Sequence, residues 1–189
     1  MGYTTDFSGH LDMSRPLTQA EAEYIRKFND VRHMRRDVNK LHEVFKGKHG
    51  NPFATTIGEI YRREGEYFVG DESTGILDHN EPPGTPARMD DWQAWWTARQ
   101  TAIKNGDSLP GLWCQWTVNR EGDRLEWDGG EKFYNYHEWL QYLITHFFDK
   151  WGVKLSGVIQ WQGEDRADFG LIVVENNSIG VKSGKVVYI

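Results

Sequence analysis

Indole side chains stand next to hydrogen-bonding side chains at three places between residues 110 and 168, a stretch that holds six of the nine tryptophans. The three groups are Trp113-Cys114-Gln115-Trp116, Glu126-Trp127-Asp128 and Gln160-Trp161-Gln162. An indole ring stacks on the flat face of a base or a sugar, and a neighbouring amide can hydrogen-bond to that group. These residues predict a binding surface for a small polar ligand, and a nucleotide-like ligand is its specific form.

The sheet face that carries the indoles decides between two interpretations. Successive side chains of a strand point to opposite faces. If the indoles face a helix-covered core, the outer face carries their polar neighbours Gln115, Asp128, Gln160 and Gln162. If the faces are reversed, an open sheet face shows indoles beside amides. Both interpretations stay open, because Leu112, Cys114 and Val118 already supply an apolar face opposite Trp113.

Two segments could hold an anion. The basic segment Arg32-His33-Met34-Arg35-Arg36 could contact phosphate, and its alternative is a solvated helix end. The turn Asp128-Gly129-Gly130-Glu131-Lys132 leads towards a helix, and its backbone amides could bind an anion or simply join a strand to that helix. The predicted ligand-binding residues are Trp113, Gln115, Trp127, Lys132, Tyr134, Trp161, Gln162, Arg32 and Arg36.

Carboxylates supply the alternative, catalytic hypothesis. Asp128, Glu131, Glu164 and Asp165 could form an acidic site for acid/base or metal-assisted hydrolysis if they converge in one pocket. Acidic turns between strands are more often simply solvated, so we favour a protein without catalytic activity. The discriminating observation is whether the four carboxylates meet.

No metal or cofactor is predicted. The seven histidines show no pair at the spacing of helical metal ligands, and the one cysteine, Cys114, excludes a cysteine pair. Cys114 lies in an alternating apolar strand, where a buried structural thiol is expected. The sequence also lacks a nucleophile elbow, a P-loop and a dinucleotide-binding fingerprint.

Composition limits the partners. A net charge of −6 argues against general nucleic-acid binding, which needs a clustered positive surface. No apolar run approaches the roughly 18 residues of a membrane helix, and the N-terminus is too polar for a secretory signal. A single cysteine is typical of a reducing compartment. We therefore expect a cytoplasmic protein with no membrane partner.

The C-terminal half must position most of the predicted site. Period-2 alternation predicts a hairpin from residue 112 to 127, and 3.6-residue periodicity predicts the main helix over 135–150. Short strands are expected at 158–162, 171–174, 179–182 and 185–188. The fold class is α+β: a two-layer domain with an antiparallel sheet of five or six strands, the main helix on one face and N-terminal helices around it.

The N-terminal half is predicted to be mainly helical. Thr18 and Glu21 have capping-box spacing at the start of one helix, and Asp37 caps a second. A third helix is expected over 53–61 and a short strand over 66–69, followed by an irregular loop over 70–87. We predict one domain, 1–189, with a helical insertion at 86–106 that serves as a lid, an interface or plain packing.

Several short segments of the sequence resemble those of a family of small, uncharacterised proteins of bacteriophages and bacteria. They are DFSG (6–9), RHMRRD (32–37), PGLWCQW (110–116), WDGGEKFYNYHEWLQYLITHF (127–147) and GVIQWQGEDRADFG (157–170). In the family, an Asn-x-Pro-Pro loop runs almost directly into the Trp-Cys-Gln-Trp strand. Here the 86–106 helix separates Asn80–Pro83 from that strand, which supports the insertion. The resemblance implies a phage or prophage context and supplies no mechanism.

Three functional hypotheses follow. The first is a non-enzymatic, phage-type accessory protein that binds a small nucleotide-like ligand or a host protein. The second is the hydrolase with the four carboxylates. The third is a protein–protein interaction module that uses the helix carrying Trp92–Trp96.

Overall fold

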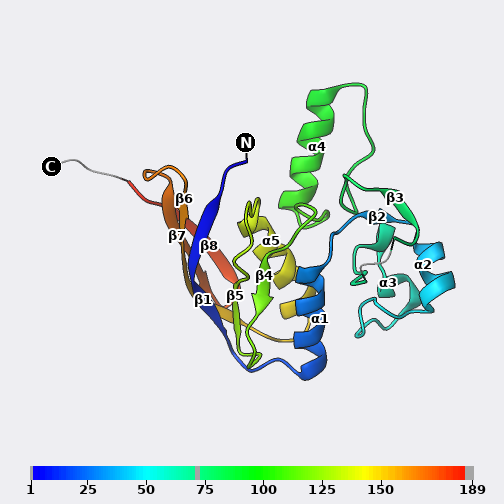
Figure 1. The fold of residues 1–189 in the computed structure, drawn as a ribbon, viewed down its shortest axis with the longest axis horizontal. Helices are drawn as coiled ribbons and strands as arrows, with labels where there is room; N and C mark the ends of the chain where they lie inside the picture. The colour runs from blue at the N-terminus through cyan, green and yellow to red at the C-terminus, as the bar shows by residue number, and fades with distance from the viewer. Residues whose placement is uncertain (1, 71–72, 186–189) are drawn as a thin grey trace. The chain divides into compact units, whose positions relative to one another are not determined.

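The computed structural model describes residues 2–70 and 73–185, and the chain divides into two compact units (Figure 1). The first unit combines Met1–Ile25 with Gln115–Ile189, and the second unit is Arg26–Cys114. Helix α1 (Gln19–Asp30) begins in the first unit and ends in the second. The predicted insertion, 86–106, lies inside the second unit, and its origin as an insertion stays a prediction.

A six-stranded antiparallel sheet forms the first unit, in the order β4-β5-β1-β6-β7-β8. The strands are β1 (Thr5–Met13), β4 (Trp116–Val118), β5 (Arg124–Trp127), β6 (Leu155–Gly163), β7 (Phe169–Glu175) and β8 (Ser178–Ser183). The main helix is α5 (Tyr136–Leu143), which continues as a π-helical turn, η2 (Ile144–Phe148). The predicted α+β class is confirmed, and so are the antiparallel sheet, predicted to have five or six strands, and the main helix.

The core lies on one face of this sheet. Inward side chains alternate along the strands, and the apolar residues of α5 are buried. The ribbon shows α5 beside the sheet (Figure 1). The fully buried inward residues include Leu11, Leu125, Leu155, Ile159 and Ile172, and those of α5 include Trp139, Leu140 and Leu143. The other face is open, and Val158 and Leu171 are exposed there.

Strand β1 is the element that the sequence patterns do not predict. Its residues include Asp6, Gly9 and Asp12, which have low strand propensity. All nine residues nevertheless pair with β6, from Thr5 opposite Gly163 to Met13 opposite Leu155. A Cβ at Gly9, where φ is +98°, would come within 2.5 Å of the Val158 carbonyl oxygen, so this close pairing requires glycine. Tertiary pairing overrides local propensity in this strand.

The second unit has its own elements and its own small core. The helices are α2 (Val38–Phe45), α3 (Ile57–Ile60), the 3₁₀ turn η1 (Arg63–Gly65) and α4 (Trp92–Lys104). A two-stranded sheet pairs β2 (Arg35–Arg36) with β3 (Ile76–Asp78). Leu41, Tyr61 and Phe68 form a buried cluster in this unit.

The predicted N-terminal caps of two helices are confirmed. Thr18 N–H donates to Glu21 Oε2 over 2.7 Å, and Glu21 N–H donates to Thr18 Oγ1 over 3.3 Å, which is the predicted capping box. The Asp37 carboxylate accepts from the amides of Asn39 and Lys40 at the start of α2, as predicted.

Three predictions in the second unit are wrong in part. Residues 66–69 form no strand: all four are buried, the first two lie in a turn, and Glu66 pairs with Arg62. The loop over 70–87 contains the short strand β3. The helix predicted over 86–106 begins only at Trp92. The Asp91 carboxylate accepts hydrogen bonds from the backbone N–H groups of Gln93 and Ala94, which have no partner within the helix, and so fixes its start.

The last predicted strand, 185–188, falls outside the described residues except for Lys185, which is not in a strand. Within residues 2–70 and 73–185, no helix is long and apolar enough to cross a membrane.

Candidate functional site

The tryptophans of the predicted ligand surface lie mainly on the helix-covered face. Trp116 and Trp161 are 0% and 6% exposed, and Trp127 is half-buried. Trp116 Nε1 donates to the Tyr136 carbonyl over 2.7 Å, which ties β4 to the start of α5. Of the two interpretations left open by the sequence, the one with the indoles in the core describes Trp116 and Trp161. Trp113 belongs to the second unit and is 49% exposed.

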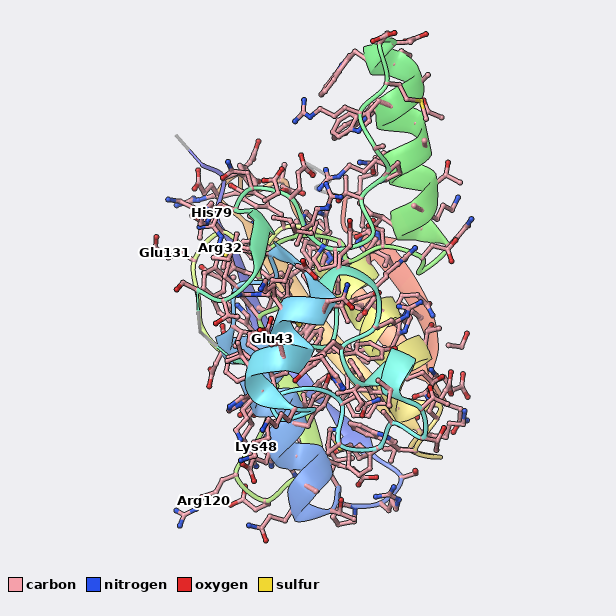
Figure 2. All side chains as sticks on the ribbon, turned by 90° about the vertical axis from the view of Figure 1, so that its right-hand side faces the viewer. Arg32, Glu43, Lys48, His79, Arg120 and Glu131 are labelled. Atoms are coloured by element: carbon pink, nitrogen blue, oxygen red, sulfur yellow. The ribbon has the colours of Figure 1, made fainter. Side chains whose placement is uncertain are left out.

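Gln115 joins several predicted residues into one hydrogen-bonded loop. Its Oε1 accepts from Trp127 Nε1 over 3.1 Å, and its Nε2 donates to the Glu131 carbonyl over 2.9 Å. Asp128 uses its carboxylate to accept from Gly130 N–H over 2.7 Å. The Glu131 side chain is exposed and points away from the ribbon (Figure 2). These polar groups therefore hold the 128–131 turn in shape.

The N-terminal segment fixes the other pair of predicted carboxylates. Thr4 N–H donates to Glu164 Oε1 over 2.8 Å, and Asp165 N–H donates to Tyr3 Oη over 3.3 Å. The Tyr3 hydroxyl donates to Asp168, and this hydrogen bond raises the pKa of Tyr3. The acidic loop, residues 163–168, is thus anchored to the two residues directly before β1.

Lys132 and Tyr134 lie beside the same N-terminal segment. Tyr134 Oη accepts from Tyr3 N–H over 3.2 Å, and Lys132 Cδ lies 3.0 Å from the position that a Cβ on Gly2 would take. Burial raises the pKa of Tyr136, and the Asp168 carboxylate adds to that effect. The structure thus places Lys132 and Tyr134 next to the segment that also holds the acidic loop.

The four carboxylates of the hydrolase hypothesis are organised by different partners. Asp128 and Glu131 belong to the turn held by Gln115, whereas Glu164 and Asp165 belong to the loop held by Tyr3 and Thr4. Among the residues that the structure describes, no group of three or more His, Cys, Asp or Glu side chains could hold a metal ion. Acid/base catalysis stays a hypothesis.

Arg32 and Arg36 belong to the second unit. Arg36 is 2% exposed, its Nη1 donates to the Thr74 carbonyl over 3.0 Å, and its guanidinium lies 4.8 Å from the Phe68 ring centre. Burial lowers the pKa of Arg36. Arg32 is half-buried. Arg36 therefore packs into the core of its unit.

A hollow lies on the open face of the first unit, across β6, β7 and β8. The register places Gln160, Leu171 and Lys182 in one row across the three strands. Phe169 precedes Leu171 by two residues and so points to the same face. The hollow has a volume of about 300 Å³ and is lined by Gln160, Phe169, Gly170, Leu171, Lys182, Ser183 and Gly184.

Glycine shapes one wall of this hollow. Gly184 N–H donates to the Phe169 carbonyl over 2.7 Å, which places the two residues opposite each other. A Cβ on Gly184 would come within 2.0 Å of Phe169 Cε2, so the absence of a side chain leaves room for the aromatic ring. The hollow therefore depends on a glycine opposite an aromatic residue.

The predicted residue Gln162 lies two residues beyond Gln160 on β6 and therefore on the same face as the hollow. It pairs with Phe169, and its Nε2 donates to the carbonyls of Gly163, Asp165 and Asp168 over 3.0, 2.9 and 3.2 Å. This amide holds the acidic loop where the chain enters β7.

Sequence reasoning missed Phe169, Leu171 and Lys182. A signal was present, since the run from Phe169 to Val174 is apolar at almost every position and therefore supplies apolar side chains to both faces of the sheet. The register that adds Lys182 to them comes only from the pairing of β7 with β8. No family model, curated protein or solved structure matches this chain, so the site is defined by its own residues.

Proposed function

We propose that this protein is a non-enzymatic binding protein whose ligand is small and nucleotide-like, and that the ligand occupies the hollow on the open sheet face. The supporting observation is a space of about 300 Å³ with Phe169 and Leu171 as apolar walls and Lys182 at its border. This volume lies at the lower end of ordinary small-molecule sites. In this proposal the aromatic ring that stacks on the ligand is Phe169 and not an indole, because Trp116 and Trp161 are buried in the core.

Each wall of the hollow suits one part of such a ligand. A base that stacks on an aromatic ring gains about 1–3 kcal/mol. The Gln160 amide offers both a donor and an acceptor for the edge of a base. The Lys182 ammonium can pair with a phosphate through a charge-assisted hydrogen bond.

The charges around the hollow favour one phosphate group over a chain of phosphates. Lys182 is the cationic side chain among the seven residues that line it. The acidic loop, with Glu164 and Asp165, runs directly into Phe169 and would repel further phosphates. The ligand class that we propose is therefore a nucleoside monophosphate or a planar molecule of the same charge.

Calorimetric titration with the four common nucleoside monophosphates and their nucleosides tests this proposal. We expect at least one monophosphate to bind, and Lys182→Gln to weaken that binding by about tenfold, the value of one hydrogen bond to a charged group. Nucleoside binding should not change. Lys150→Gln, which removes an exposed lysine of the same unit outside the hollow, is the matched control. The absence of binding for every compound, or equal effects of the two variants, would overturn the proposal.

A protein partner on α4 is the second candidate function. Trp92 and Trp96 are 61% and 41% exposed, and the Trp92 ring stacks on Trp95 with centres 4.9 Å apart. Trp95 itself is buried, with Nε1 donating to the Pro86 carbonyl over 3.3 Å. A Trp92→Gln/Trp96→Gln variant that still captures every protein bound by the wild type would remove this candidate, and Trp95 should be left intact.

The proposed location is the cytoplasm, or the host cytoplasm if the protein is phage-encoded. The one cysteine of the sequence, Cys114, is buried and forms no disulfide, which suits a reducing compartment. Cell fractionation tests the location, and inspection of the neighbouring genes tests the phage or prophage origin.

A further inference from the structure

Strand β8 presents a free edge. It is the last strand of the sheet and has a neighbour, β7, on one side only in the described part of the chain. Five of its six residues are exposed, and it contains no proline and one charged residue, Lys182. A strand of this kind offers a row of backbone groups to another strand.

The ladder with β7 shows which backbone groups point outward. Gly184 donates to the Phe169 carbonyl, so residues 169 and 184 form a hydrogen-bonded pair. Hydrogen-bonded and non-hydrogen-bonded pairs alternate along an antiparallel ladder. Ser178, Gly180 and Lys182 therefore direct their N–H and C=O groups toward β7. The groups that point outward are those of Ile179, Val181 and Ser183.

These outward groups are complementary to a second copy of the same strand. Pairing them antiparallel with full overlap permits one register, with Val181 opposite the partner's Val181 and Ile179 opposite the partner's Ser183. Each of these pairs exchanges two hydrogen bonds. The same register sets Lys182 opposite the partner's Gly180, so no two like charges face each other directly. Val181, 46% exposed, would lie at the twofold axis.

We propose that a second copy of this chain pairs with β8 across this twofold axis and joins two sheets into one. The partner's Ser178 then stands opposite Gly184 and adds a hydroxyl to the wall of the hollow. The two Lys182 side chains lie diagonally, about 7–8 Å apart at the backbone, on the open face. Six residues of strand make a small interface, so the dimer is weak and depends on concentration. The pairing does not rest on the proposed ligand.

Sedimentation velocity over a range of protein concentrations tests the pairing. The variants introduce a charge of either sign at Val181, on the twofold axis. Val181→Lys and Val181→Glu each place two like charges opposite each other, and each should weaken self-association at least about tenfold. An equimolar mixture of the two variants should restore the dimer, because Lys then faces Glu. This rescue requires that residue 181 faces its own copy, and an unrelated strand bound at this edge would not produce it.

Val158→Lys and Val158→Glu are matched controls. Val158 is 47% exposed, lies on β6 and is not at an edge of the sheet, so neither variant should alter self-association. A wild-type chain that stays monomeric up to about 1 mM overturns the inference, and so does a mixture that fails to restore dimers between folded variants. The outcome is independent of the titrations with nucleotides, because Val181 points to the face opposite the hollow.

Discussion

The two faces of the six-stranded sheet carry different kinds of side chain: one face is packed into the core and the other is exposed. On the helix-covered face, Ile159 and Trp161 are buried, and the Trp161 ring centre lies 6.2 Å from that of Tyr136 in α5. On the open face, their neighbours Val158 and Gln160 are exposed, and the row of Gln160, Leu171 and Lys182 borders the hollow. Aromatic residues are concentrated on the first face because they fill the core. The ligand that we propose uses the second face, where polar and charged groups remain accessible.

The strongest test of this comparison changes adjacent residues of β6. Ile159→Ala removes a fully buried side chain and should lower the free energy of unfolding by about 2–5 kcal/mol. Val158→Ala, on the open face, should change it by no more than about 0.5 kcal/mol. Urea unfolding of both variants is the measurement, and similar losses would contradict the assignment of the two faces.

A buried histidine extends the comparison to the second unit and to pH. His33 is 3% exposed, its Nε2 lies 2.9 Å from the Phe28 carbonyl oxygen, and burial lowers its pKa to about 4. The folded state thus favours neutral imidazole, so this stability is complete above the ordinary pKa of 6.5 and is lost as pH falls toward 4. The loss amounts to about 3 kcal/mol if the pKa difference is fully expressed.

The measurement is the free energy of unfolding between pH 7 and pH 4. His33→Gln should flatten its decline, whereas His10→Gln, on the open face of β1, should leave the wild-type decline in place. Equal slopes for the wild type and His33→Gln would show that another group controls acid sensitivity.

A side chain that fills the hollow tests the comparison of the two sheet faces, because it changes the open face and leaves the core face intact. Gly184→Val pushes against the Phe169 ring and should abolish ligand binding, with a stability cost of about 1–3 kcal/mol from overpacking. Gly180→Val, on β8 and on the same face, is its control, because the nearest atom to an added Cβ there is 3.7 Å away. Binding by Gly184→Val at wild-type affinity, measured by calorimetry, would place the ligand elsewhere.

The smallest expected effect distinguishes the roles of two glutamine side chains on the open face, Gln160 and Gln162. Gln162→Ala removes the donor to three carbonyls of the acidic loop and should lower the free energy of unfolding by about 1 kcal/mol. Gln160→Ala should leave stability unchanged and weaken ligand binding. Chemical denaturation and calorimetry on both variants would reject the assignment if the two roles were exchanged.

Local signals predicted those parts of the fold that depend on neighbours in the chain. The capping box of Thr18 and Glu21, the cap at Asp37 and the period of the main helix are set by residues a few positions apart. The short run Glu66–Val69 was wrongly predicted to be a strand, because these residues are buried in a turn and the irregular segment after it. Gln115 and Trp127 of the predicted ligand surface and Asp128 and Glu131 of the predicted acidic site form one hydrogen-bonded network, and this network supports a turn.

The sequence by itself determined the α+β class, the hairpin, the main helix and the alternation that separates indoles from amides. It could not determine which face the helix covers, or that residues 5–13 form the centre of the sheet. Only the tertiary structure decided that β1 pairs with β6, some 150 residues away, and that Phe169, Leu171 and Lys182 line one hollow. The physical reason is that register between distant strands depends on long-range packing and backbone pairing, which leave no local pattern in the chain.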